Sequence, residues 1–421
     1  MNRRIRALTV LAAAAATAVA ATACDSSGGE GGSAVTEVVV GIDLPMQGSS
    51  KDASDSTVNA MKLYMKQAGD KAGKYKVTLK VYDDSTAAAG KWDAAQCTKN
   101  ANDHVANATE VAVMGTYNSG CAQLQIPVLN QDPNGPLLMI SHANTNPGLT
   151  KPWEPGEPAK WYPTNVRNYA RVVTTDDYQG KAGAQMAAKD LGVKHCLVLD
   201  DTETYGKGVA KQFADEAGKQ GIKVDTAAWD AKATNYNALF NKAKTDGVDC
   251  VFTGGVFDNN GGQLVKDKVR ILGDNKTVKL IGPDGFVGYP EFDKLAEAEG
   301  SYQTFPGLGL SDLAKSAVTG KFLEDYKKEY GKDPDSPYAL YGVQALQVIL
   351  AAIEKSDGTR KSVTSQVLGG SGITIPASSA ILGKDIKIDP ATGDVNAIDM
   401  TIQTITGGKE ATVKAWPVAV S

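Results

Sequence analysis

The pattern of hydrophobic and polar positions alternates between two periods along the chain. Short apolar runs rich in valine and isoleucine indicate strands, and the longer segments between them carry apolar side chains at helical spacing. Strands are predicted at 37–42, 76–82, 111–115, 137–141, 195–199, 223–228, 249–253 and 278–282. Helices are predicted at 54–68, 92–105, 180–191, 206–219, 236–245, 261–272, 313–330 and 338–355, and a further β-like segment at 397–405.

The alternation of strands and helices predicts an α/β fold with parallel sheets flanked by helices. The alternation runs twice, over 37–150 and again over 170–290. Between the two copies lies the segment 151–161, in which four prolines and glycines block regular structure. We therefore predict a long connection at a domain boundary. About 385 residues follow position 36, a length that suggests two or more domains.

The N-terminal segment has the three-part layout of a secretion signal. Arginines at 3, 4 and 6 precede an apolar run over 7–20, and the small residues 21–23 follow it. The apolar run is shorter than the roughly 20 residues that a membrane span needs. Cys24 comes directly after the small residues, and this arrangement resembles the lipobox of bacterial lipoproteins, in which the thiol is diacylated. The alternative is ordinary secretion with cleavage near Ala23.

These observations predict a signal peptide over 1–23 and a lipid-anchored, flexible tether over 24–36. Glycine and serine dominate the tether, and such a composition does not bury a core. The expected location is extracytoplasmic, on the outer face of the bacterial cell membrane, with Cys24 as the anchor. A hydrophobic fraction of 42% and a charged fraction of 22% are ordinary for a soluble globular domain. The net charge of −4 shows no excess of basic residues of the kind that binds nucleic acid.

Four further cysteines lie in the body of the chain. An exported protein meets oxidising conditions, in which an even number of cysteines favours disulfides. Three pairings are possible, and proximity in the sequence favours Cys97–Cys121 and Cys196–Cys250. A zinc site would be the alternative, but the chain has no CxxC motif and its three histidines are scattered. We therefore predict no metal site.

Candidate ligand-binding residues follow the predicted strands, because ligands of parallel α/β sheets bind beyond the carboxyl ends of the strands. Hydroxyl groups and helix starts at this edge suit an anion, and a carboxylate suits an ammonium group. Each residue also has a structural alternative, because serine and threonine often cap helices and aspartate often forms turns. The candidates are Ser49, Asn118, Ser119, Ala143, Asn144, Thr145, Tyr205, Phe257 and Asp284.

The motifs of several enzyme classes are missing from the sequence. There is no GxSxG elbow, no HExxH motif, no GxxxxGK[ST] loop and no GxGxxG after the first strand. The chain is therefore predicted not to be an enzyme and to need no cofactor.

The residues at these strand ends resemble a known family, the branched-chain amino-acid class of extracytoplasmic solute-binding proteins that serve ABC importers. The resemblance covers nearly all of the chain after the tether. It rests on Val39-Val40-Gly41-Ile42 with Leu44-Pro45 and Gly48, on Gly115 with Asn118-Ser119-Gly120, on Leu138-Met139-Ile140-Ser141-His142-Ala143-Asn144-Thr145-Asn146-Pro147, on Arg171 with Asp176 and Gln179-Gly180, on Tyr205-Gly206, and on Gly282-Pro283-Asp284-Gly285.

The resemblance implies a type I periplasmic-binding-protein fold, in which two Rossmann-like lobes close on a ligand about a three-stranded hinge. The implied lobes are 37–168 plus 305–380 and 169–304 plus 381–421. Ser119, Ala143 and Thr145 would hold the carboxylate and amine of an amino acid from the first lobe, and Tyr205 and Asp284 would contribute from the second. Asp284 is shorter than the glutamate common there.

The sequence thus predicts an ABC-importer substrate-binding lipoprotein for a small solute, most simply a branched-chain-type amino acid. Its expected partners are the small-molecule ligand, a membrane permease and, through the lipid, the membrane itself. We expect a monomer and no nucleic-acid partner. The alternatives are a ligand-sensing ectodomain or amide-type receptor on the same fold, binding of an amide, a short peptide or an aromatic acid, and an exported enzyme.

Overall fold

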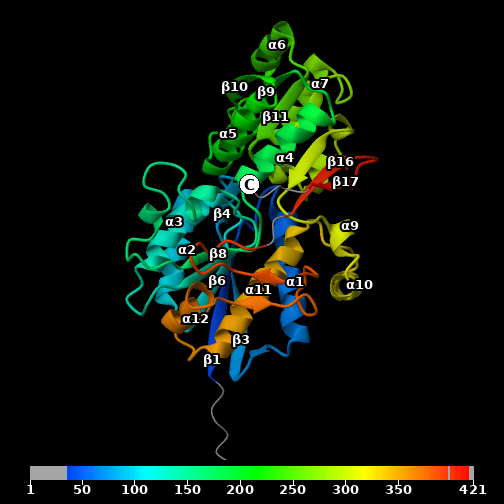
Figure 1. The fold of residues 1–421 in the computed structure, drawn as a ribbon. Coiled ribbons are helices and arrows are strands. Elements are labelled where there is room, and N and C mark those ends of the chain that lie inside the picture. Colours follow the sequence, from blue (N-terminus) through cyan, green and yellow to red (C-terminus); the bar gives the residue numbers. More distant parts are fainter. Residues whose placement is uncertain (1–35, 397–398, 417–421) are drawn as a thin grey trace, which may run out of the picture. The chain divides into compact units, whose positions relative to one another are not determined.

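The computed structural model describes residues 36–396 and 399–416, which belong to one compact unit, Val35–Ser421. The predicted signal peptide, Cys24 and nearly all of the tether lie outside the described residues. Within the described part of the chain, no helix is both long and apolar enough to cross a bilayer. The described residues form two α/β lobes, each built on its own sheet (Figure 1).

The first lobe is built on a sheet of six strands in the order β2-β3-β1-β6-β7-β8. All neighbours pair in parallel except β2 and β3. The strands are β1 (Glu37–Leu44), β2 (Lys71–Ala72), β3 (Tyr75–Asp83), β6 (Glu110–Gly115), β7 (Leu138–Ser141) and β8 (Tyr169–Arg171). A separate two-stranded ribbon, β4 (Ser85–Thr86) and β5 (Lys91–Trp92), follows β3.

Helices cover both faces of the first sheet. One apolar core joins β1 to α1 (Lys51–Gln67), α11 (Tyr338–Lys355) and α12 (Arg360–Leu368). A second core lies under α3 (Ser119–Asn130), which packs beside α2 (Ala94–Ala106). Most of α11 is buried on all sides, and this explains why its sequence is apolar almost throughout.

The second lobe is built on a sheet of seven strands in the order β10-β9-β11-β12-β13-β16-β17. The first five are parallel, and β16 and β17 complete the sheet in antiparallel fashion. The strands are β9 (His195–Asp200), β10 (Lys223–Ala228), β11 (Cys250–Gly254), β12 (Lys279–Gly282), β13 (Tyr302–Phe305), β16 (Met400–Ile405) and β17 (Glu410–Trp416). One face packs on α4 (Asp176–Lys189) and α5 (Thr204–Lys219), the other on α6 (Asn237–Asp246) and α7 (Gly261–Leu272).

The chain passes between the two lobes three times, after β8, after β13 and before β16. Thr174 joins all three crossings, because its backbone N–H donates to Pro306 O over 3.1 Å and its hydroxyl donates to Asp399 O over 3.0 Å. The predicted fold class, with its three-stranded hinge, is confirmed. The lobe boundaries stay a prediction; β8, which begins at the predicted boundary 169, pairs within the first sheet.

Most predicted elements are present, and the differences have local causes. The helix predicted from 92 begins at Ala94, because the Asp93 side chain caps it by accepting from two backbone N–H groups. The helix predicted over 313–330 is divided into α9 (Leu310–Leu313) and α10 (Ala317–Tyr330). The structure adds α3, α12, β8 and β13, whose sequences carry weak periodicity, and short α8 (Pro290–Asp293), β14 (Thr374–Ile375) and β15 (Ile386–Lys387).

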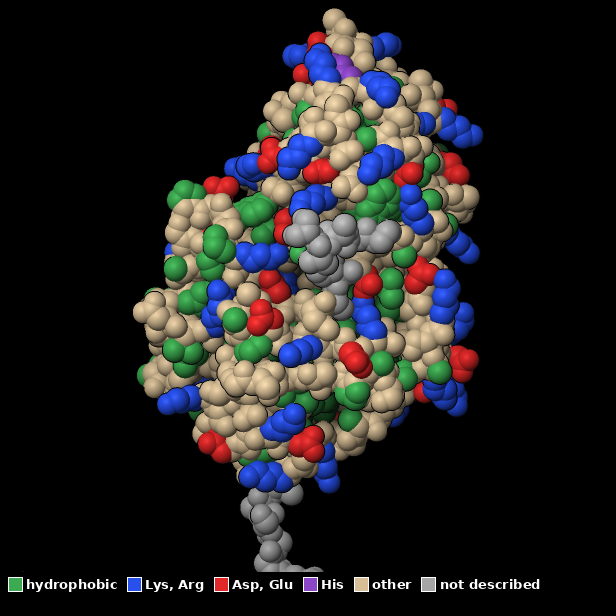
Figure 2. Space-filling model, viewed as in Figure 1, with side chains coloured by type: hydrophobic (Ala, Val, Ile, Leu, Met, Phe, Trp, Pro, Cys, Tyr) green, Lys and Arg blue, Asp and Glu red, His purple; other side chains and the backbone are tan. Residues whose placement is uncertain are grey.

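The charged side chains on the face of the molecule shown in Figure 2 are of both signs and are interspersed. This face carries no continuous basic surface of the kind that binds nucleic acid.

One of the two predicted disulfides is present. Cys97 in α2 and Cys121 in α3 are bonded with Cα atoms 5.6 Å apart, and both are fully buried. Closing a loop of this length stabilises a fold by about 3 kcal/mol in the chain-entropy model. Asp84 lies beside the two sulfurs, which the bond makes unavailable as metal-binding thiolates.

The second predicted disulfide is wrong: Cys196 and Cys250 are free and buried. They lie directly opposite each other on the paired parallel strands β9 and β11. Parallel neighbours are held about 4.8 Å apart with their Cβ atoms side by side, whereas a disulfide needs Cβ atoms about 3.8 Å apart. Proximity in the sequence does not reveal this register.

Alkylation should separate the two cysteine pairs. We expect iodoacetamide to label Cys196 and Cys250 in the unfolded, unreduced protein, because both thiols become accessible there. Cys97 and Cys121 should be labelled only after reduction, and none of the four in the native protein. Peptide mass spectrometry reads out each position. Unlabelled Cys196 and Cys250 in the unfolded, unreduced chain would show that they are bonded after all.

Candidate functional site

A small cavity lies where the carboxyl ends of strands from both sheets face each other. Its volume is about 20 Å³, which is room for about one water molecule. The walls come from the segments that follow β6, β7, β9, β11 and β12, together with the start of α11. The nine lining residues are Tyr117, Asn118, Ser119, Ala143, Tyr205, Val256, Asp284, Gly285 and Tyr338.

The first lobe presents the start of a helix to this cavity. Helix α3 begins at Ser119, and Asn118 precedes it without capping it through its side chain. The first backbone N–H groups of a helix have no partner within the helix, and they carry its positive dipole end. Ser119 adds a hydroxyl group, which among residues 36–396 and 399–416 accepts only a long hydrogen bond of 3.4 Å from Asn146 N. This wall therefore suits a carboxylate.

The loop after β7 places Ala143 and Thr145. The Ser141 hydroxyl accepts from Ala143 N over 3.1 Å and from Asn144 N over 2.8 Å, which sets the turn. Asn144 is fully buried, and its side-chain amide donates to the carbonyl oxygens of residues 116 and 117. Asn144 thus supports the loop, while Ala143 lines the cavity. The buried Thr145 hydroxyl makes no hydrogen bond of normal geometry with any described residue.

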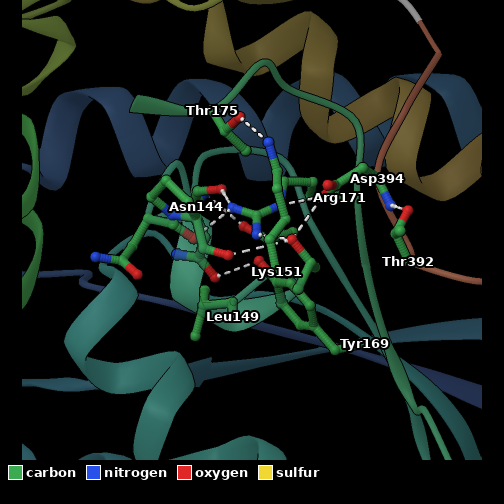
Figure 3. A network of polar contacts seen from close by, with 12 residues as sticks. Asn144, Leu149, Lys151, Tyr169, Arg171, Thr175, Thr392 and Asp394 are labelled. Carbon is green, nitrogen blue, oxygen red and sulfur yellow. Dashed lines mark hydrogen bonds and ion pairs between the residues drawn. The ribbon is translucent and has the colours of Figure 1, made fainter. Parts of the chain in front are cut away.

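Arg171, at the end of β8, holds this loop from behind (Figure 3). Its side chain is fully buried and donates to Asn144 O over 2.7 Å, to Asn146 O over 2.9 Å and to the Thr150 hydroxyl over 2.7 Å. Its Nε also donates to Asp394 Oδ1 over 2.9 Å. Because Asp394 shortly precedes β16 along the chain, the guanidinium group joins the binding loop to the approach of the third crossing.

Asp284 is the charged residue that the second lobe contributes. Its Oδ1 accepts from the Tyr205 hydroxyl over 2.5 Å and from Gln179 Nε2 over 2.6 Å, and its Oδ2 accepts from the Tyr338 hydroxyl over 2.6 Å. Burial raises the pKa of Asp284 to about 6, although the two tyrosine hydroxyls lower it. A carboxylate oxygen can accept two hydrogen bonds, so Oδ2 retains one lone pair.

Asp176, the first residue of α4, is a second buried carboxyl group near Asp284. It is fully buried, and among the described residues neither of its oxygens makes a hydrogen bond of normal geometry. Burial first, and then the charge of Asp284, raise the pKa of Asp176 well above its usual range, while the nearby Thr145 hydroxyl lowers it. An unpaired buried carboxyl group is costly, so Asp176 favours a ligand that donates hydrogen bonds.

Four of the nine candidates do not line the cavity: Asn144 and Thr145 in the loop after β7, and also Phe257 and Ser49. Phe257 packs into an aromatic cluster of the second lobe, with its ring 5.3 Å from that of Tyr289. Its neighbour Val256 lines the cavity instead. Ser49 is not among the lining residues either, but Ser50 beside it bonds to the second lobe: its N–H and hydroxyl donate to Asp258 over 2.9 and 2.6 Å.

Polar contacts at the rim also join the two lobes. Lys91, in the ribbon strand β5, forms an ion pair with Glu203 and a hydrogen bond with Asn259. The neighbouring Trp92 donates from its indole nitrogen to Glu203 over 2.9 Å. These contacts hold the lobes together beside the cavity.

Several residues of the site received no binding role from the sequence. Tyr117 could have been found, because it directly precedes Asn118 in a segment already singled out. Asp176 and Gln179 were named only as residues that carry the resemblance to the family. No pattern in the sequence pointed to Tyr338. It lies in α11, far along the chain, and only the fold brings this helix back to the first lobe.

Comparison with known proteins agrees with this architecture. A family model described as periplasmic binding protein matches residues 37–409. The leucine-, isoleucine-, valine-, threonine- and alanine-binding protein of Pseudomonas aeruginosa is 27% identical over 269 residues, which are 63% of this chain and 64% of that relative's length. The Leu/Ile/Val-binding protein BraC3 of Rhizobium johnstonii is 24% identical, covering 89% of this chain and 94% of its own.

The fold is also found among solved structures. The crystal structure of the leucine binding protein LivK from Thermotoga maritima superposes with a TM-score of 0.75 at 20% identity, covering 90% of this chain and 98% of that one.

Proposed function

The chain belongs to the periplasmic binding protein family, and on that premise we propose that it captures an amino acid between its two lobes and delivers it to an ABC permease. The family is one of solute-binding proteins, not of enzymes. The observation that carries the proposal is the pairing of an anion-binding helix start with the buried carboxyl group of Asp284 on the wall of one cavity, with the buried Asp176 near it. That combination suits a molecule that carries a carboxylate and an ammonium group together.

The carboxylate of the ligand would bind at the start of α3. Ser119 offers its hydroxyl and the first N–H groups of the helix, and these favour an anion without a full positive charge. Among the described residues that line the cavity there is no lysine or arginine. A ligand with a carboxylate alone would therefore meet Asp284 without a compensating cation, and this disfavours simple aromatic acids.

The ammonium group of the ligand would bind between Asp284, Asp176 and Thr145. An ammonium group has three donors, and this corner offers a free lone pair on Asp284 and the unpaired oxygens of Asp176 and Thr145. A charge-assisted hydrogen bond is about twice as strong as a neutral one. The cavity has room for about one water molecule, and contacts already join the lobes beside it. The lobes would therefore open by bending at the three crossings joined at Thr174 to admit the ligand, and close again so that both walls reach it.

Membership of the family implies a location outside the cytoplasm. We further propose that the chain is a monomer held at the outer face of the cell membrane by a lipid on Cys24, with residues 24–36 as the tether. The lobe boundaries given above belong to the same proposal. Mass spectrometry of the mature N-terminal peptide tests the anchor, because a diacylated Cys24 adds the mass of the lipid; an unmodified N-terminus would remove the anchor and leave the binding assignment intact.

A thermal-shift and calorimetry screen tests the binding function. The twenty amino acids, small amides, short peptides and aromatic acids would be added to the purified protein. A ligand that binds only the folded state stabilises it by about 2.7 kcal/mol at a concentration a hundredfold above Kd. We expect at least one amino acid to raise the melting temperature. If only amides, peptides or aromatic acids do so, the amino-acid assignment is wrong.

Affinity for the ligand should depend on pH through Asp284, because only the ionised carboxylate pairs with an ammonium group. With its pKa at about 6, Asp284 becomes protonated below that pH. We expect Kd measured by calorimetry to rise about tenfold between pH 7.5 and pH 5. The stability of the ligand-free protein should change in the opposite direction. Because its pKa is raised, Asp284 contributes stability at low pH, and this contribution is lost as the pH rises through about 6. A Kd that stays constant across this range would contradict the ammonium-binding role.

A further inference from the structure

Three side chains on or directly behind the cavity wall have buried polar atoms that make no hydrogen bond of normal geometry within the described part of the chain. They are the Tyr117 hydroxyl, Asn118 Oδ1 and both ring nitrogens of His142. The exposed fractions of these residues are 7%, 6% and 0%. Tyr117 and Asn118 line the cavity. None of the three belongs to the corner formed by Asp284, Asp176 and Thr145, so an ammonium group held there would leave them unpaired.

His142 lies behind the aromatic part of the wall. Its ring centroid is 6.0 Å from that of Tyr117 and 5.7 Å from that of Tyr338, and it meets Tyr338 edge-on at 74°. Burial lowers the pKa of His142 to about 3, so the ring is neutral and holds one N–H donor and one acceptor. Both need a partner, and a buried polar group without one is costly.

The ionisable groups around this part of the wall are acidic. Burial raises the pKa of Tyr117, the neighbouring Tyr289 hydroxyl lowers it, and the acidic groups of Asp284, Asp258 and Glu410 raise it further. No cationic side chain is found among the described residues lining the cavity. A carboxylate on the side chain of the ligand would therefore be repelled, whereas a hydroxyl, amide or cationic group would meet acceptors.

From this wall we infer that the ligand is an amino acid whose side chain carries a neutral or cationic hydrogen-bonding group, and that aliphatic side chains of the same shape bind less tightly. The inference rests on the proposed function and narrows its ligand class. It separates this chain from relatives named for leucine, isoleucine and valine alone, such as BraC3. An aliphatic side chain would leave the Tyr117 hydroxyl and Asn118 Oδ1 of the cavity wall with nothing to pair. Sites built around hydrogen bonds reject analogues that lack the bonding group.

Calorimetry with matched amino acids tests the inference. Threonine and valine have nearly the same shape, as do asparagine and leucine, and glutamine and glutamate differ mainly in charge. We expect the tightest ligand among the twenty amino acids to be polar and not acidic, with a Kd at least about tenfold below that of its aliphatic counterpart. If leucine, isoleucine or valine binds as tightly as the best polar amino acid, the inference is overturned and the proposed function stands. If no amino acid binds, the proposed function is wrong, and the inference falls with it.

A substitution at Tyr117 tests whether the cavity wall causes the preference for polar over aliphatic side chains. Tyr117→Phe removes the unpaired hydroxyl and keeps the ring, so it should reduce the ratio of polar to aliphatic affinity by about tenfold. Tyr302→Phe is the matched control, because Tyr302 lies in β13 and does not line the cavity; it should leave the ratio as it is. An unchanged ratio in Tyr117→Phe, with the melting temperature preserved, would show that this hydroxyl does not select the ligand.

Discussion

Replacing Asp284 by asparagine is expected to weaken ligand binding by about thirtyfold to several thousandfold. Removing one partner of a buried, hydrogen-bonded charge pair costs about 2–5 kcal/mol, and each 1.4 kcal/mol is a factor of ten in Kd. The amide keeps the shape of the carboxylate but loses the charge that pairs with an ammonium group. Its NH₂ group would also face the Tyr205 and Tyr338 hydroxyls or Gln179, which all donate to Asp284 now.

Calorimetry with the tightest ligand from the screen measures this effect, and a melting curve shows that the variant is folded. Asp225→Asn is the matched control, because Asp225 lies on β10 and pairs with His195 outside the cavity. The control should bind as the parent does. The Asp284→Asn variant should also lose the change of Kd between pH 7.5 and pH 5. If Asp284→Asn retains full affinity, the residue is only a turn residue at the start of a 3-10 helix.

Replacing Arg171 by methionine is expected to lower the free energy of unfolding by about 3–5 kcal/mol, the cost of breaking a buried charge pair by removing one partner. Methionine keeps most of the apolar length of the side chain but leaves Asp394, Thr150 Oγ1 and two loop carbonyls without their donor. Urea titration measures the change in the unfolding midpoint. Ligand affinity should fall as well, because the loop that carries Ala143 and Thr145 loses its support.

Lys211→Met is the matched control for this substitution. Lys211 lies in α5 and forms an ion pair with Asp215 one turn along the same helix, and their side chains are 57% and 50% exposed. Exposed pairs contribute about 0–1 kcal/mol, so this variant should unfold close to the parent midpoint. Similar losses in the two variants would show that the buried network of Arg171 adds nothing beyond an ordinary surface contact. Normal affinity in a destabilised Arg171→Met variant would show that the loop keeps its conformation without it.

The strands and long helices of this chain could be predicted from the sequence, because their cause is local. A strand covered on both faces must be apolar over its whole length, and a helix must repeat its apolar face every turn. The predicted bounds 261–272 and 338–355 coincide with α7 and α11, and the predicted strand 195–199 is one residue shorter than β9, which is buried along nearly its whole length. Helix α3 was missed because it contains Pro127 and its apolar side chains are not gathered on one face.

The candidate site was predictable in part for a similar reason. Residues after parallel strands meet at one edge by the geometry of the sheet, so Asn118, Ser119, Ala143, Tyr205 and Asp284 could be named in advance, and they line one cavity. Phe257 could not be placed, because neighbouring positions of a loop point in different directions. Its neighbour Val256 takes the place on the wall.

The sequence by itself determined the fold class, the family and the edge of each sheet at which a ligand binds, because each depends on local periodicity or on motifs of neighbouring residues. Only the tertiary structure decided which groups from distant parts of the chain meet one another. Tyr338 reaches Asp284 from 54 positions away, Arg171 reaches Asp394 from 223 positions away, and Cys196 lies opposite Cys250 in a register that leaves both thiols free. Such contacts follow from the packing of whole lobes and from strand register, and no local pattern of residues encodes them.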